Sequence, residues 1–182
     1  MKQPSDHAPK GLIKYVTGDA TLPNGSSLRY LIQIVNDAGK YGAGFSGALN
    51  TRWPKVETEY RGWWRARYGK LNLGDIQVIQ VLSDLVVINM VAQHDVVSKE
   101  NPKPIDYKAL QLCLAKVGVE VSQYNASVHM PRIVHLAFGI LLWALHPSHE
   151  LHGAMVLHRF HLPLGAIVPY SNLVDQCQQI LS

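Results

Sequence analysis

The stretch from Leu31 to Leu49, LIQIVNDAGKYGAGFSGAL, constrains the fold of this chain more than any other. Its apolar, partly β-branched start predicts a buried strand that ends at two polar residues, Asn36 and Asp37. Four glycines follow in quick succession, namely Gly39, Gly42, Gly44 and Gly47. A helix is predicted directly after them, and a helix N-terminus offers free N–H groups to an anion. The stretch therefore indicates either an ordinary turn or a phosphate or diphosphate site, with Asn36 and Asp37 beside it for sugar hydroxyls.

Three familiar signatures are not expected in this stretch. The four glycines, taken together, are not assigned to the spacing G-x-G-x-x-G of a dinucleotide-binding turn. No Gly-Lys-Ser/Thr follows the glycines, which excludes a P-loop. Gly44 and Ser46 are not followed by a glycine at the offset of a nucleophile elbow. Ser46 is therefore predicted to be an ordinary helix residue, and no nucleophilic triad is visible.

Length and composition favour one globular domain. The chain has 182 residues, of which 47% are hydrophobic and 16% charged. We predict a loose arm at 1–10 and a single domain at 11–182, whose part 134–182 is atypical. The net charge of +4 suits either an anionic small ligand or nucleic acid and decides between neither.

The cysteine spacing and the hydropathy indicate the cellular compartment that we expect for the protein. Cys113 falls in a helical apolar stripe and is predicted to be a packed thiol, and with Cys177 it shows no metal or redox spacing. The first ten residues lack the apolar core of a signal peptide. The longest apolar stretch, 133–145, is too short to span a bilayer. We expect a cytoplasmic protein that has no membrane partner and needs no cofactor.

Hydrophobic periodicity predicts strands that alternate with helices. Strands are predicted at 12–17, 29–35, 75–81, 85–91 and 127–133. Helices are predicted at about 43–52, from Pro54 to about Tyr68, and behind Asp106 as an N-cap through Tyr124. This alternation predicts an α/β sandwich around a parallel or mixed sheet.

Polar residues stand where several of these strands end. They are Asp19, Asn36, Asp37, Asn89, Gln93 and Arg132. Ligands of open α/β sheets bind outside the carboxyl ends of the strands. A carboxylate at Asp19 would accept a hydrogen bond from an exocyclic amine such as that of adenine, or it is a turn aspartate. Asn89 and Gln93 either face a ligand or bond to nearby backbone groups.

Four segments carry a resemblance to a known family: VTGDAT (16–21), IVNDAGKYGAGFSGAL (34–49), INMVAQ (88–93) and SVHMPRI (127–133). In this order the chain resembles the macrodomains, which bind ADP-ribose. It is most similar to the branch that contains the terminal ADP-ribose protein glycohydrolase and the macrodomain of a chromatin remodeller. The resemblance covers about residues 11–133. It implies a three-layer α/β/α sandwich with a central mixed sheet.

The resemblance also implies roles for particular residues. Asp19 would bond the adenine amine, with Gly18 beside it, and Asn36 would hold the distal ribose. Gln93 and Met90 would line the pocket near the base. The turn that wraps the diphosphate through its backbone N–H groups would be Gly42, Ala43, Gly44 and Phe45.

The chain departs from the family pattern at two places. Relatives that cleave the ADP-ribosyl–glutamate bond use a lysine on the strand before INMVAQ, where this chain offers only Gln77 and Gln80. Glutamine cannot form the covalent lysyl intermediate. Relatives also follow the last motif with a glycine-rich second phosphate loop, which VHLAFGILLW replaces here. Because charge falls and histidine rises abruptly at Val134, a frame-shifted or recombined ending is one hypothesis for 134–182.

The sequence thus predicts a protein that binds ADP-ribose or ADP-ribosylated groups. Hydrolysis of an ADP-ribose ester or phosphate monoester remains open, with a bound water near Asn36, the candidate catalytic residue. One alternative is a degenerate macrodomain without a ligand. Another is a nucleic-acid-binding module built from Arg61, Trp63, Trp64, Arg65 and Arg67.

A metal site in the C-terminal part is not expected. Its histidines His146, His149 and His152 recur every third residue, but Pro147 interrupts a helix there. For the same part we predict a buried element, a strand at 166–168 and a short helix capped by Ser171.

Overall fold

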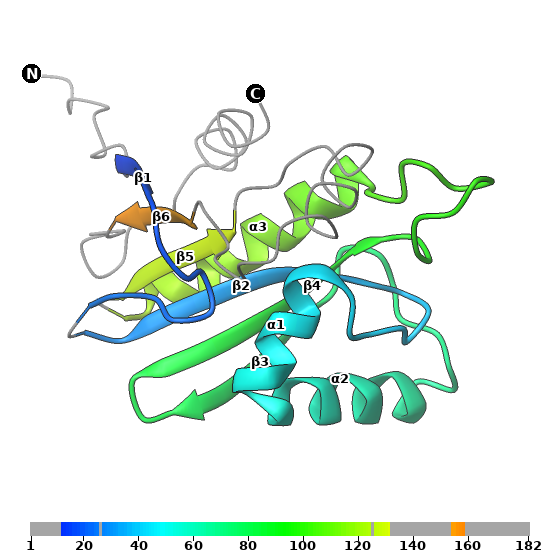
Figure 1. Ribbon diagram of the computed structural model, residues 1–182, viewed down its shortest axis with the longest axis horizontal. Helices are drawn as coiled ribbons and strands as arrows, with labels where there is room; N and C mark the ends of the chain where they lie inside the picture. The colour runs from blue at the N-terminus through cyan, green and yellow to red at the C-terminus, as the bar shows by residue number, and fades with distance from the viewer. Residues whose placement is uncertain (1–11, 26, 125, 132–153, 159–182) are drawn as a thin grey trace, which may run out of the picture.

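The computed structural model describes residues 12–25, 27–124, 126–131 and 154–158 of the chain. In chain order the elements are β1 (Leu12–Val16), β2 (Arg29–Asn36), α1 (Gly44–Arg52), α2 (Pro54–Ala66), β3 (Ile76–Leu82), β4 (Leu85–Gln93), α3 (Tyr107–Ser122), β5 (Ser127–Pro131) and β6 (Ala154–His158). Figure 1 shows β2 and β4 side by side in the sheet, between the helices.

The strands form one mixed sheet in the order β1-β6-β5-β2-β4-β3. β2 is parallel to both β4 and β5, whereas β3 runs antiparallel to β4. β6 runs antiparallel to β5 and to β1. The pairing of β2 with β4 shifts register between Val35 and Asn36, so that Asn36 comes opposite Gln93. The carboxyl ends of β2 and β4 therefore meet at the same edge of the sheet.

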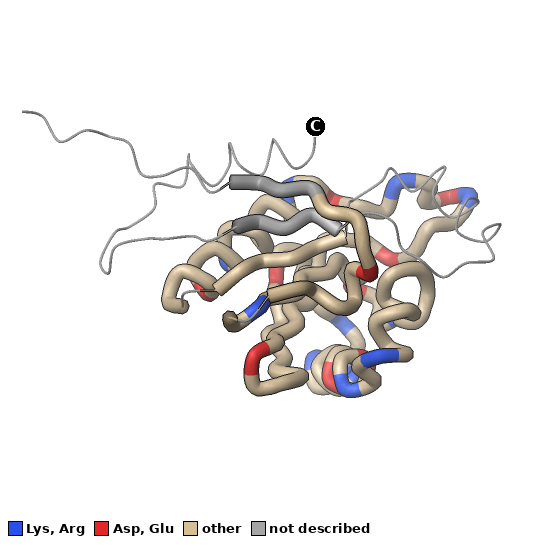
Figure 2. Tube along the Cα trace, turned by 60° about the vertical axis from the view of Figure 1, so that its left-hand side comes forward, with Lys and Arg blue, Asp and Glu red and all other residues tan. Residues whose placement is uncertain are grey.

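Alternating side chains of the central strands serve two separate cores. Tyr30 and Ile32 on β2 pack with Ile88 on β4 against α3. Leu31 and Val87, on the opposite face, pack with the residues of α1 and α2. Because strand side chains point to the two faces in turn, β4 is buried along nearly its whole length. The described fold is thus the expected three-layer α/β/α sandwich (Figures 1 and 2).

Helix α3 begins where the sequence predicts. The side chain of Asp106 accepts a hydrogen bond from the backbone N–H of Ala109 at 2.9 Å, which satisfies one of the free N–H groups of the first turn. Cys113 is fully buried on the helix face that meets the sheet, as expected for a packed thiol. Both predictions for this helix are confirmed.

The other predicted elements between residues 12 and 131 are also confirmed, with small shifts at their ends. The second helix ends at Ala66 rather than near Tyr68, because the chain turns there into a left-handed conformation at Tyr68 and Gly69. Strand β6 was not predicted. The predicted strand at 166–168 and the helix behind Ser171 lie outside the described residues. The division into an arm and a single domain stays a prediction.

No helix within the described ranges is long and apolar enough to cross a membrane. In the same part of the chain, no three metal-ligating side chains gather into a group. His146, His149 and His152 lie outside it.

Candidate functional site

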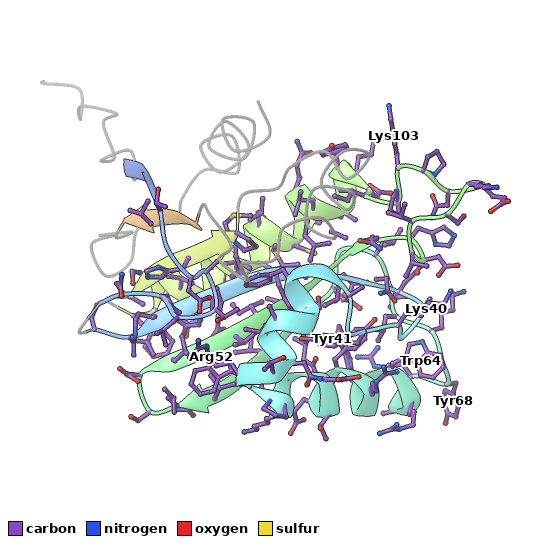
Figure 3. The ribbon with its side chains drawn as sticks, in the orientation of Figure 1. Lys40, Tyr41, Arg52, Trp64, Tyr68 and Lys103 are labelled. Atoms are coloured by element: carbon purple, nitrogen blue, oxygen red, sulfur yellow. The ribbon has the colours of Figure 1, made fainter. Side chains whose placement is uncertain are left out.

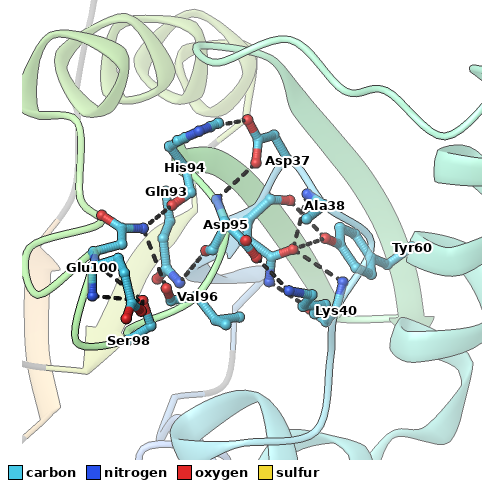
Figure 4. A network of polar contacts seen from close by, with 12 residues as sticks. Asp37, Ala38, Lys40, Tyr60, Gln93, His94, Asp95, Val96, Ser98 and Glu100 are labelled. Atoms are coloured by element: carbon cyan, nitrogen blue, oxygen red, sulfur yellow. Dashed lines mark hydrogen bonds and ion pairs between the residues drawn. The ribbon is translucent and has the colours of Figure 1, made fainter.

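The side chain of Asn36 holds the backbone of the turn that follows β2. Its Oδ1 accepts hydrogen bonds from the backbone N–H groups of Ala38 at 3.1 Å and Lys40 at 3.0 Å. Its Nδ2 donates to the carbonyl oxygen of Lys40 at 2.6 Å. Figure 4 shows the polar network at this edge of the sheet, with Ala38 and Lys40 labelled. The amide of the candidate catalytic residue is therefore largely engaged in holding the backbone of the turn.

Tyr60 of α2 bonds to Asn36 through its hydroxyl. Its hydroxyl lies 2.6 Å from the carbonyl oxygen of Asn36 and 3.0 Å from Oδ1, and it donates its proton to this pair of acceptors (Figure 4). The ring is fully buried. Burial raises the pKa of the Tyr60 hydroxyl above its ordinary value, so the group remains a donor at any physiological pH.

Asp37 ties the loop after β4 to the end of β2. Its Oδ1 accepts from the backbone N–H of Asp95 at 2.8 Å, and its Oδ2 lies 2.7 Å from Nδ1 of His94. The hydrogen bond to Asp37 raises the pKa of His94 above its ordinary value. The side chain of Gln93 donates to the carbonyl oxygen of Asp95 at 2.7 Å. The side chains of Asp37 and Gln93 thus both bond within the protein, whereas Asp37 is expected from the sequence to bind sugar hydroxyls and Gln93 to line the pocket near the base.

The glycines after Asn36 divide into two kinds. A Cβ at Gly39, whose φ is 72°, would lie 2.4 Å from the ring of Trp64, and one at Gly47 would lie 2.5 Å from the carbonyl oxygen of Gly42. These two are glycines because other atoms occupy the space of a side chain. At Gly42 and Gly44, with φ of 109° and 60°, a Cβ would meet no atom of the described residues within 4 Å. Within the described part of the chain, the backbone there lies beside open space.

The first turn of α1 is open as well. Ala43 occupies the N-cap position without a side-chain hydrogen bond, and no acidic residue stands in the first turn. The first N–H groups of a helix have no partner inside the helix, and the helix dipole makes them attractive to an anion. Phe45 is partly buried against the core below α1 and α2, whereas Ala43 is exposed. This turn has the chemistry of a phosphate site.

The exclusion of a dinucleotide-binding spacing from the sequence is wrong at this turn. Gly42, Gly44 and Gly47 have the spacing G-x-G-x-x-G between a strand and a helix, the arrangement of many dinucleotide-binding turns. Gly47 has the role of the third glycine in that pattern, because it lets the helix approach the backbone of Gly42.

Asp19 lies at the opposite end of α1. Its Oδ1 accepts from the backbone N–H and the hydroxyl of Thr21 at 2.8 and 2.7 Å, and its Oδ2 pairs with Arg52 at 2.9 Å. Partial burial alone would raise the pKa of Asp19, but the hydrogen bonds from Thr21 and the charge of Arg52 lower it. Gly18 beside it is exposed. Sequence reasoning did not identify Arg52 as a partner of Asp19.

The structure therefore does not bring the two halves of the expected site into contact. Asp19 meets the C-terminal end of α1 through Arg52, whereas the glycine turn forms its N-terminus. Eight residues of helix separate Gly44 from Arg52, a rise of about 12 Å. Figure 3 shows Arg52 and Tyr41 on opposite sides of α1. A ligand that touches both Asp19 and the glycine turn must be extended.

Met90 does not face this edge. Its side chain is fully buried in the core between the sheet and α3, on the face away from α1 and α2. Its expected place in the lining of the pocket is therefore corrected to a packing role. Asn89 is also fully buried, on the other face, and bonds to Gln33 and Gln77. Arg132 lies outside the described residues.

The aromatic residues of α2 are packing groups. Trp63 and Trp64 are partly buried against the cluster around Tyr60, and the ring of Trp64 lies against Gly39. Figure 3 shows Trp64 at the end of α2 that is nearer to Tyr68. Arg61 pairs with Glu57 at 2.7 Å and donates to the carbonyl oxygen of Gly39 at 3.1 Å. Helix α2, at the bottom of the view in Figure 2, carries both acidic and basic residues. Arg61 and Trp64 thus contact the turn at Gly39, whereas Arg65 and Arg67 are exposed.

Known proteins place this fold in a class. No family model matches the chain. A solved structure of a macrodomain protein from Streptomyces coelicolor is 34% identical, has a TM-score of 0.58, and is matched over 70% of this chain and 86% of its own. A protein of unknown function from Bacteroides thetaiotaomicron is 38% identical, with a TM-score of 0.60, over 64% of this chain and 74% of its own. The class that fold and turn define is the α/β/α macrodomain.

Two more distant comparisons agree with that class. The macrodomain of Mycobacterium tuberculosis DarG shares the fold at 16% identity, with a TM-score of 0.53 over 94% of this chain and 90% of its own. The mouse chromodomain-helicase-DNA-binding protein 1-like is 30% identical over 169 residues, 87% of this chain. The chain spans only 17% of the length of that mouse protein. This chain belongs to the macrodomain family, which supports binding of ADP-ribose-related ligands in general.

Proposed function

We propose that this protein binds ADP-ribose, or an ADP-ribosylated group, at the edge of the sheet where β2 and β4 end. The observation that carries the proposal is the turn from Gly42 to Phe45. Among the described residues, nothing fills the space beside its two glycines, and the helix that begins there has no side-chain cap. In a macrodomain this is the place for the diphosphate, whose oxygens would accept hydrogen bonds from the free N–H groups.

The remaining parts of the ligand extend from this turn in two directions. The distal ribose lies next to Asn36, whose Nδ2 has a second N–H beyond the one it donates to Lys40. The adenine amine meets Asp19 at the far end of α1, where the carboxylate is kept ionised by Thr21 and Arg52. Only an extended ligand, such as ADP-ribose, would reach both places.

Binding is a better proposal than hydrolysis. The position of a reactive lysine is taken by glutamines: Gln77 is bonded to Asn89, and Gln80 is exposed. A water held near Asn36 would have to compete with the backbone of the turn for the same amide. Hydrolysis of an ester or phosphate monoester of ADP-ribose is therefore the second possibility to measure, by product formation after long incubation.

Titration calorimetry of the purified full chain tests the proposal, with ADP-ribose as ligand and AMP and ribose 5-phosphate as controls. We expect micromolar binding of ADP-ribose that Gly44→Glu abolishes, because a carboxylate at that position repels the diphosphate. Asp19→Ala should weaken binding of ADP-ribose and AMP together. Gly62→Ala, in the middle of α2 with nothing within 4 Å of the new Cβ, is the matched control.

Two outcomes would contradict the proposal. One is a folded wild-type protein that releases no heat with ADP-ribose. The other is binding that Gly44→Glu leaves intact. In the first case a salt-dependent affinity for single-stranded nucleic acid, measured by fluorescence anisotropy, would favour the nucleic-acid alternative.

A further inference from the structure

A buried glutamine lies beneath the glycine turn and bonds to residues on both sides of it. Gln33 of β2 is only 2% exposed. Its Nε2 donates to the hydroxyl of Tyr41 at 2.8 Å, and its Oε1 accepts from the hydroxyl of Ser46 at 2.9 Å. Tyr41 directly precedes the turn 42–45 and Ser46 directly follows it. One side-chain amide in the sheet thus anchors both ends of this turn.

A further hydrogen bond, to a residue of β4, fixes the orientation of this amide. The second N–H of Gln33 donates to Oδ1 of Asn89 at 2.7 Å. Asn89 in turn donates to Oε1 of Gln77 at 3.0 Å, and Gln77 donates to the carbonyl oxygen of Glu59 in α2 at 3.0 Å. Each side-chain amide donates an N–H to the oxygen of the next residue. The chain of hydrogen bonds therefore runs in one direction from β2 through β4 to β3. Both donors of Gln33 are used, and its oxygen faces Ser46.

Packing alone does not call for a polar residue at this position. Leu31 and Val35, the neighbours of Gln33 on the same face of β2, are apolar and buried. A buried amide must recover its lost hydration through hydrogen bonds, and an apolar side chain of similar size would avoid that cost. Buried polar networks are instead associated with one defined geometry of the groups they join. Here the joined groups are the two ends of the turn.

Within the described part of the chain, the turn 42–45 has few other contacts besides the packing of Phe45 against the core. Gly42 and Gly44 have left-handed backbone conformations and no side chain, and the N-cap residue makes no side-chain bond. Glycine-rich backbone is permissive, so its N–H groups converge on an anion only when the neighbouring residues are fixed. Gly47 limits the helix side by its contact with Gly42.

We infer that Gln33 is a positioning residue of this site: through Tyr41 and Ser46 it holds the turn 42–45 in the conformation that directs its N–H groups at a diphosphate. The identity of the ligand in this inference rests on the proposed function. The hydrogen bonds of Gln33 to Tyr41 and Ser46 do not depend on it. Gln33 does not touch the ligand.

The test compares three single variants of the full chain. Ser46→Ala removes the hydroxyl that Gln33 accepts from, and Gln33→Met replaces the amide by an apolar side chain of similar length. Thr51→Val is the matched control, because among the described residues its hydroxyl bonds only to the carbonyl oxygen of Gly47 in the same helix, at 3.2 Å. Two readouts are recorded: calorimetric affinity for ADP-ribose, and the amide NMR signals of Gly42, Ala43 and Gly44 without ligand.

We expect Ser46→Ala and Gln33→Met each to weaken ADP-ribose binding about tenfold, roughly the loss expected from one buried hydrogen bond. The amide signals of the turn should shift or broaden in both variants. Thr51→Val should change neither readout. The double variant Ser46→Ala/Gln33→Met should bind no more weakly than Gln33→Met alone, because both substitutions break the same link.

The inference is overturned if Ser46→Ala keeps wild-type affinity and leaves the amide signals of the turn unmoved. If Gln33→Met fails to fold, Ser46→Ala still tests the inference, because it removes only one hydroxyl and should leave the fold intact. If the wild type binds no ADP-ribose, the proposed function fails. The NMR readout, which needs no ligand, then tests the positioning role separately.

Discussion

The hydroxyl of Tyr60 and the carbonyl oxygen of Asn36 lie 2.6 Å apart, and this contact joins α2 to the last residue of the central strand. The same hydroxyl lies 3.0 Å from the side-chain oxygen of Asn36, which also holds the backbone of the following turn. A residue of the helical layer thus supports the residue that shapes the edge of the sheet. The geometry of the candidate site depends on this contact between layers.

Removing the Tyr60 hydroxyl should therefore destabilise the protein. Tyr60→Phe withdraws the donor from buried acceptors, which costs about 1–3 kcal/mol of unfolding free energy. The ring and its packing remain. Urea unfolding followed by tryptophan fluorescence measures the change. Tyr124→Phe serves as the control, because Tyr124 is half exposed and its hydroxyl makes no hydrogen bond to the described residues. Equal stability of the two variants would contradict the role assigned to Tyr60.

Gly39 and Gly62 should respond in opposite ways to the same substitution. Gly39→Ala places a Cβ 2.4 Å from the ring of Trp64 at a φ of 72°, and we expect a loss of about 2 kcal/mol or more. Gly62→Ala adds a methyl group to an open position inside α2 and should stabilise the protein by about 0.5–1 kcal/mol. Thermal unfolding of both variants gives the comparison. Stabilisation by Gly39→Ala would refute the contact with Trp64.

His94 should titrate above its ordinary pKa of 6.5, because Asp37 accepts a hydrogen bond from its ring. A raised pKa in the folded state means that this pairing stabilises the fold fully below the unfolded pKa. The contribution is lost as the pH rises through the folded pKa. NMR titration measures the value, and His94→Gln identifies the signal. Asp37→Asn should lower the pKa of His94 while its amide oxygen still accepts from Asp95. An unchanged pKa would contradict the pairing.

Cys113 should be inert in the native protein. Burial raises the pKa of its thiol to about 12, so the reactive thiolate is scarce at pH 8 and the sulfur is inaccessible. In a Cys177→Ser variant, iodoacetamide should label Cys113 in urea but hardly at all in buffer. Mass spectrometry measures the extent of labelling. Rapid labelling of the folded variant would show that the core around α3 opens readily.

The sequence predicted the elements of the described fold well, because their signals are local. The apolar runs of β2 and β4, the N-cap Asp106 and the apolar stripe of α3 each depend on residues close together in the chain. Strand β6 was missed, since its pairing with β1 and β5 joins segments far apart in sequence. The partners of Asn36 in the turn are only two and four residues away, but the support from Tyr60 comes from another layer.

The sequence by itself determined the α/β class, the glycine turn after β2 and the chemistry that such a turn offers, because backbone conformation and hydrophobic alternation are properties of neighbouring residues. Only the tertiary structure decided which polar groups are already occupied. It placed Met90 in the core below α3, paired Asp19 with Arg52 and joined Gln33 to both ends of the turn. These outcomes depend on which segments the sheet and the helical layers bring together, since a hydrogen bond forms only where donor and acceptor meet in space.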